Sequence, residues 1–70
     1  MPYRTNDDLP PPVRHVLPAH AQDIYRAAFN NAWQLYAQDL VHREERCHRI
    51  AWAAVKRAYH KTDDGWVANA

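Results

Sequence analysis

The chain has 70 residues, near the lower limit of roughly 70–80 at which a domain buries enough surface to fold without disulfides or metals. Nine basic and eight acidic side chains give a net charge of +1, which excludes the broad positive field of many nucleic-acid-binding domains. A single cysteine excludes an internal disulfide. No apolar run approaches the ~20 residues of a membrane-spanning helix. The proline- and aspartate-rich start does not resemble a signal peptide. We therefore expect one soluble, cytoplasmic domain over residues 1–70.

The N-terminal third predicts a turn followed by a short helix. Residues 1–9 are polar and contain Asp7 and Asp8, whose side chains commonly cap helices and turns. Three prolines at 10–12 fit the first turn of a helix from about Pro11 to Val16. Pro18 ends that helix and suits the start of the next one.

Two longer helices follow, because apolar residues recur at three- and four-residue spacing in two segments. The first segment begins at Pro18, and the second predicts a helix from about Arg43 to His60. Alanines on both stripes favour a close, antiparallel helical hairpin. Only residues 38–42 remain to turn the chain, and they contain neither glycine nor proline. We favour a monomer with a helical hairpin. The alternative is a dimer in which one long, continuous helix is exchanged between two chains.

After the third helix, a turn at Asp64-Gly65 is expected to return Trp66 and Val67 to the core, beside residues 2–4. The two termini then form either a small two-stranded ribbon or extended coil. The predicted fold is thus all-α, an irregular array of about three helices, a short helix plus a long helical hairpin, with extended termini packed on it.

The core is small, because twelve of the apolar residues are alanines. Its larger contributors are expected to be Ile24, Phe29, Leu35, Ile50, Val55, the three tryptophans and the four tyrosines. Trp52 lies to one side of the third helix's stripe. We expect it to pack under the first helix or the termini; the alternative is an exposed contact for a partner.

The residues that carry chemistry do not form a catalytic or metal-binding pattern. The chain has no serine, Cys47 lies on the apolar stripe, and its neighbour His48 points about 100° away on a helix. No two histidines have the three- or four-residue spacing that places two ligands on one helical face. One glycine cannot build a phosphate-binding loop. We therefore expect neither an enzyme nor a cofactor or metal site.

The third helix nevertheless has a basic polar side. Its cations, with one just beyond its end, are Arg43, Arg46, Arg49, Lys56, Arg57 and Lys61. Such a side is usually solvated, but it can follow a phosphate backbone. A small nucleic-acid-associated helical module is therefore the alternative function.

Two dense sequence blocks, His15 to Trp33 and His42 to Lys56, resemble the ChaB family of small bacterial and baculoviral proteins, as do Met1-Pro2-Tyr3 and Asp63-Asp64-Gly65-Trp66. The resemblance covers nearly the whole chain, and it implies a cytoplasmic accessory protein that contacts a cation/proton antiporter. The candidate partner-contact residues are His15, His20, Asp23, Arg26, Arg46, Arg49, Lys56 and Arg57.

Overall fold

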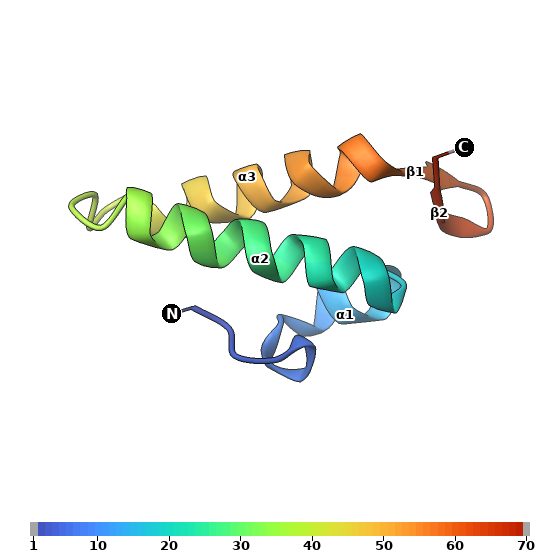
Figure 1. The fold of residues 1–70 in the computed structure, drawn as a ribbon, viewed down its shortest axis with the longest axis horizontal. Helices are drawn as coiled ribbons and strands as arrows, with labels where there is room; N and C mark the ends of the chain where they lie inside the picture. The colour runs from blue at the N-terminus through green and yellow to red at the C-terminus, as the bar shows by residue number, and fades with distance from the viewer. Residues whose placement is uncertain (1, 70) are drawn as a thin grey trace.

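Three helices are followed by a two-stranded antiparallel sheet in the computed structural model, which describes residues 2–69 (Figure 1). The elements are a 3-10 turn η1 (Asn6–Asp8), helices α1 (Pro11–Val16), α2 (Ala19–Leu35) and α3 (Arg43–Ala58), and strands β1 (Tyr59–Thr62) and β2 (Gly65–Ala68). The fold is therefore mostly helical. It is not the all-α fold that the sequence predicted, because β1 and β2 form a β-hairpin after the last helix.

The short helix α1 has the predicted bounds, Pro11–Val16. Prolines occupy its first turn, where the missing amide proton has no partner in any helix. Leu17 leaves helical geometry ahead of Pro18, as expected for a residue that precedes proline. Helix α2 then begins immediately after Pro18.

Helices α2 and α3 lie side by side and run in opposite directions, so the predicted hairpin is confirmed (Figure 1). The connection spans residues 36–42, two residues more than expected, because α2 already ends at Leu35. The alanine stripes meet between the two helices: Ala32 of α2 and Ala51 of α3 are at most 1% exposed. Small side chains at these positions let the two backbones approach closely.

The end of α3 was predicted wrongly, and of the two alternatives for the termini the ribbon between them does not form within residues 2–69. Helix α3 stops at Ala58 rather than His60, because Tyr59–Thr62 pairs antiparallel with Gly65–Ala68. Gly65, with a φ of 116°, supplies the backbone conformation that the tight turn requires. The two-stranded ribbon thus forms within the C-terminal segment, and β2 does not pair with the N-terminus.

The N-terminal segment instead lies along α2. The Asn30 side chain accepts a hydrogen bond from the Tyr3 backbone N–H and donates one to the Tyr3 carbonyl oxygen, each at 2.8 Å. The Tyr3 ring packs on Phe29, with 4.7 Å between ring centroids. Further along, Leu9 is 1% exposed, and its carbonyl accepts a bond from Arg14 Nε at 3.0 Å.

A mainly aromatic core joins these elements. Phe29, fully buried, contacts the rings of Tyr3, Trp33 and His48. Trp52 is half-buried between Tyr25 and Trp66, so the packed alternative for this side chain is confirmed. Leu35 was placed wrongly in the core, because it is 73% exposed. Leu35 is the final residue of α2 and lies next to the connection to α3.

Candidate functional site

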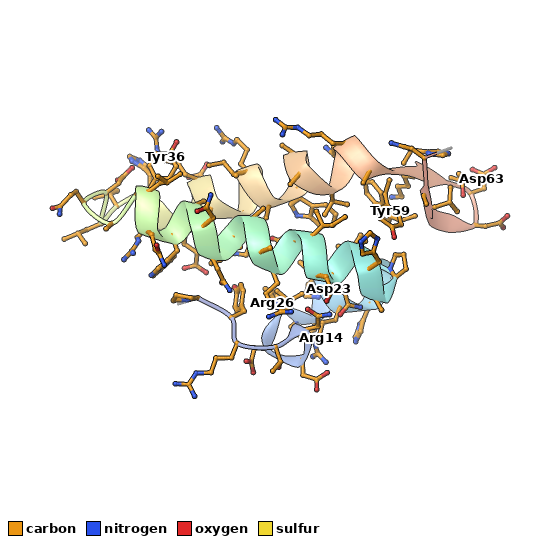
Figure 2. The ribbon with its side chains drawn as sticks, in the orientation of Figure 1. Arg14, Asp23, Arg26, Tyr36, Tyr59 and Asp63 are labelled. Carbon is orange, nitrogen blue, oxygen red and sulfur yellow. The ribbon has the colours of Figure 1, made fainter. Side chains whose placement is uncertain are left out.

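The candidate contact residues lie in separate places on the surface. One pair, Asp23 and Arg26, lies beside the N-terminal segment (Figure 2), and His15 and His20 lie on either side of Pro18. A second group, Arg46 and Arg49, lies on the first half of α3. Lys56 and Arg57 lie at the other end of the same helix. These residues therefore do not converge on one pocket.

Asp23 and Arg26 hold the N-terminal segment against α2. Asn6 donates a hydrogen bond from Nδ2 to Asp23 Oδ1 at 2.7 Å and accepts one from Arg26 Nε at 2.8 Å. A second Arg26 nitrogen donates to the Arg4 carbonyl oxygen at 3.0 Å. The two candidates thus have partners within the chain, and their bonds position residues 4–6.

The two N-terminal histidines differ in their surroundings. His15 is exposed in the last turn of α1. His20, in the first turn of α2, is exposed as a residue, but its Nδ1 lies 3.0 Å from the Tyr59 hydroxyl. Because Tyr59 is 7% exposed, this bond satisfies a hydroxyl at the edge of the core. His20 therefore also ties the start of α2 to β1.

A tyrosine–histidine pair that the sequence did not reveal lies between α2 and α3. Tyr25 is fully buried, and its hydroxyl hydrogen-bonds to Nδ1 of His48. Burial raises the pKa of Tyr25 far above its usual range, so the hydroxyl stays protonated, and the tautomer of His48 sets which of the two groups donates the proton. The other ring nitrogen, Nε2, lies 3.7 Å from Glu44. A hydroxyl on an apolar stripe is the one sequence signal for such a bond, since a buried tyrosine needs a partner.

The charged residues around the α2–α3 turn are paired with one another. Arg46 Nε lies 3.0 Å from Asp39 Oδ2, and Arg49 lies 3.2 Å from Glu45 Oε1. The His42 backbone N–H donates to Asp39 Oδ1 at 3.0 Å. This bond, together with the charges of His42 and Arg46, lowers the pKa of the Asp39 carboxyl.

Arg43 is the most firmly held cation of this region. Its guanidinium lies over the Trp33 ring, 3.8 Å from the centroid, and its Nε donates to the Trp33 carbonyl oxygen at 2.9 Å. That carbonyl is near the end of α2, where helical carbonyls lack intrahelical partners and attract cations. Arg43 therefore stabilises the hairpin.

Lys56, Arg57 and Lys61 form the unpaired part of the basic side. All three are exposed, and within residues 2–69 none of them takes part in an ion pair. Lys56 and Arg57 lie in the last turn of α3, and Lys61 lies on β1. Within residues 2–69, Arg46 and Arg49 of the predicted basic side pair with carboxylates and Arg43 is held by Trp33, whereas Lys56, Arg57 and Lys61 have no such partner.

The single cysteine and the surface hollow are the remaining features of the described residues. Cys47 is fully buried, as its place on the stripe predicted, and burial raises the pKa of its thiol, which disfavours the nucleophilic thiolate. A shallow surface hollow of about 160 Å³ is lined by His42, Glu45, Arg46 and Arg49, two of whose charges already pair with each other. Residues 2–69 contain no cluster of three or more potential metal ligands and no helix that is long and apolar enough to cross a membrane.

Comparisons with known proteins place the whole fold among close relatives. The family model named ChaB matches residues 9–69. Proteins named "Putative cation transport regulator ChaB" from Escherichia coli (strain K12) and Shigella flexneri are 56% identical over 69 residues, with 91% of each chain covered. An NMR solution structure of a protein with the same name superimposes with a TM-score of 0.86 and 52% identity, covering 99% of this chain and 100% of that one.

Proposed function

Because the chain belongs to the ChaB family, we propose that it is an accessory protein of cation transport that binds a cation/proton antiporter from the cytoplasmic side. The names of its relatives support a role in regulating cation transport. The observation that carries a binding role is the set of unpaired, exposed cations at the end of α3. Contact through a protein surface, rather than catalysis, fits a chain whose one thiol is buried and has a raised pKa.

Lys56 and Arg57 are the residues we assign to this contact. They are exposed and adjacent in the sequence, in the last turn of α3, and no carboxylate of the described chain pairs with them. An acidic segment of the antiporter would therefore complement them, and charge complementarity of this kind sets orientation and association rate. Arg49, on the same helix, already has Glu45 as its partner and is assigned a smaller part.

Regulation by such a contact requires a difference in affinity. A bound protein shifts the transporter between two conformations only if it binds one of them more tightly. The helical hairpin is suited to this role because its aromatic core and the Arg43–Trp33 contact fix the position of α3. The chain is expected to act as a monomer.

The test is recovery of the tagged full-length chain with its partners from detergent-solubilised cells, with and without nuclease. We expect a cation/proton antiporter in both samples. The variant Lys56→Glu/Arg57→Glu is expected to lose at least nine-tenths of the recovered antiporter, because repulsion replaces attraction at the contact. Arg49→Glu, an exposed charge reversal on the same helix, is the matched control and should retain it.

Two outcomes would contradict the proposal. Recovery of nucleic acid or its binding proteins only without nuclease would favour the nucleic-acid alternative, whose binding should weaken steeply as salt rises. Equal loss for Arg49→Glu and Lys56→Glu/Arg57→Glu would remove the assignment to the end of α3. Thermal unfolding of each variant establishes that a lost contact does not reflect a lost fold.

A further inference from the structure

The most exposed large apolar side chains of the described chain lie together at one end of the molecule. Leu35, Leu40 and Val41 are 73%, 85% and 83% exposed, whereas the other large exposed apolar residues, Val16 and Val67, are 47% and 39% exposed. All three lie in or next to the α2–α3 turn, which forms one end of the longest axis (Figure 1). We call Leu35, Leu40 and Val41 the apolar tip.

We propose that the apolar tip inserts into the surface of a lipid bilayer. Contiguous exposed apolar side chains with a polar rim mark contact sites in proteins. The molecule measures 38 × 21 × 16 Å, and the apolar tip lies at one end of the longest axis (Figure 1). A stable protein dimer buries about 800 Å² on each partner, which three side chains on one narrow turn do not provide. A protruding tip fits the boundary of headgroups and acyl chains, which deforms around it.

The residues directly behind the tip have the chemistry of a membrane interface. Trp33 and Tyr36 are half-buried near the end of α2, and Figure 2 shows Tyr36 at this end of the molecule. Tryptophan and tyrosine are enriched at the level of lipid headgroups, because one part of each ring system is apolar and another part forms hydrogen bonds. Arg43 lies over Trp33 and Arg46 lies over Tyr36, at 3.8 and 5.6 Å from the ring centroids.

The charges near the tip indicate that apolar contact, not electrostatic attraction, drives this binding. Asp39 lies between Arg46 at 3.0 Å and His42 at 3.7 Å, and Glu45 pairs with Arg49. The tip therefore lacks the unpaired basic cluster that attracts proteins to anionic lipid. Binding to neutral phosphatidylcholine should equal binding to a mixture with anionic lipid, and it should depend little on salt.

The expected association is weak and reversible. One myristoyl chain gives a membrane association constant of about 10⁴ M⁻¹, and three aliphatic side chains bury no more hydrocarbon than that. Half-maximal binding is therefore expected at submillimolar to millimolar lipid. This inference goes beyond the proposed function: the tip adds a lipid contact at one end of the molecule, while Lys56 and Arg57 lie toward the other.

The experiment is sedimentation of the full chain with phosphatidylcholine vesicles, and with vesicles containing one part phosphatidylglycerol to three parts phosphatidylcholine. Wild type should bind both equally. Leu40→Asn/Val41→Asn should weaken binding at least tenfold, since the two most exposed apolar side chains become polar. Val16→Asn/Val67→Asn, which removes two exposed apolar side chains elsewhere, should bind like wild type.

Three results would overturn the proposal. They are no wild-type binding at millimolar lipid, binding only to the anionic vesicles with loss at high salt, or equal binding by Leu40→Asn/Val41→Asn. Concentration-dependent self-association that this variant abolishes would assign the tip to a second copy of the chain instead. None of these results depends on the antiporter, so the lipid contact and the proposed function fail independently.

Discussion

The two ends of the helical hairpin are built in opposite ways. At the α2–α3 turn the charged side chains are paired, through Arg46 with Asp39 and Arg49 with Glu45, while the apolar side chains point into solvent. At the β-hairpin end the apolar side chains are packed, Trp66 on Trp52, and the cations are unpaired. One small chain thus presents an apolar contact at one end and a basic contact at the other.

This difference follows from which groups find partners during folding. Asp39 of the turn pairs with Arg46 and Glu45 of α3 pairs with Arg49, whereas Leu35, the final residue of α2, is 73% exposed. At the other end, β2 folds back and covers Trp52, while its turn residues Asp63 and Asp64 form no ion pair with Lys56 or Arg57. The unsatisfied groups of each end are therefore its candidate contacts.

The largest effect is expected from removing an aromatic side chain at the packed end. Trp66→Ala should lower the free energy of unfolding by about 2 kcal/mol, below the 3–5 kcal/mol typical of a fully buried tryptophan because Trp66 is half-buried. Leu40→Ala, the matched change at the apolar tip, should stay within about 0.5 kcal/mol of wild type. Urea unfolding measures both; equal losses would contradict the contrast between the ends.

The turn of the β-hairpin should be the next most sensitive position. Gly65→Ala places a side chain at a φ of 116°, so we expect a loss of about 1–2 kcal/mol from backbone strain alone. A Cβ atom at this position meets no neighbour within 4 Å, so steric crowding adds nothing. In this variant the β-hairpin should open before the helices do. Amide hydrogen exchange would then be faster in residues 59–68 than in α2. Unchanged exchange would mean that the strand pairing does not depend on this glycine.

A smaller loss of stability is expected from removing Arg43, which contacts Trp33, and almost none from removing Lys56, which has no ion-pair partner within residues 2–69. Arg43→Ala removes the contact with the Trp33 ring and the bond to its carbonyl, and it should destabilise the chain by about 1–1.5 kcal/mol. Lys56→Ala, which removes an unpaired cation from the same helix, should change stability by less than about 0.5 kcal/mol. Thermal melts of both variants test this, and a reversed order would show that the contacts of Arg43 with Trp33 do not stabilise the chain.

The smallest effect concerns pH. The pKa of Asp39 is lowered in the folded chain, chiefly by the hydrogen bond from the His42 backbone N–H. The ionised carboxylate therefore stabilises the fold above the unfolded pKa of about 3.9, and this contribution disappears as the pH falls through the lower folded value. The difference in stability between wild type and Asp39→Asn should thus shrink as the pH drops from 7 to below 4. Urea unfolding at both pH values measures it; a constant difference would contradict a role for the charge.

Much of the helical part of the fold was predictable from local signals. Pro11 and Pro18 set the bounds of α1, and the two apolar stripes gave α2, the start of α3 and their antiparallel packing. The Asp64-Gly65 turn was also predictable from the sequence, because glycine is the residue that adopts a positive φ without strain. Each of these predictions depends on residues that are near one another in the sequence.

The errors arose where distant residues compete with a local pattern. Tyr59 and His60 continue the helical pattern of α3, but pairing with Ala68 and Val67 makes them strand residues. Leu35 was expected in the core as a large apolar residue, yet it is 73% exposed at the end of α2. No local signal indicates that a buried hydroxyl on α2 will meet His48 on α3.

The candidate contacts were predictable as residue types but not as a surface. The sequence identified eight candidate residues, but it could not show that Asp23 and Arg26 hold Asn6 while Lys56 and Arg57 stay unpaired. Their assignment to a partner remains a prediction. The apolar tip was not anticipated, because Leu35 was expected inside the core.

One measurement tests the assignment of the antiporter contact to the end of α3 most directly. A photo-reactive amino acid replaces Ala53, which is exposed on α3 within one turn of Lys56 and Arg57, and cross-linking is carried out in growing cells. Ala27, exposed on α2, is the matched control position. The account predicts an adduct with a cation/proton antiporter at position 53 and none at position 27. Equal adducts at both positions, or none with a transporter at position 53, would contradict it.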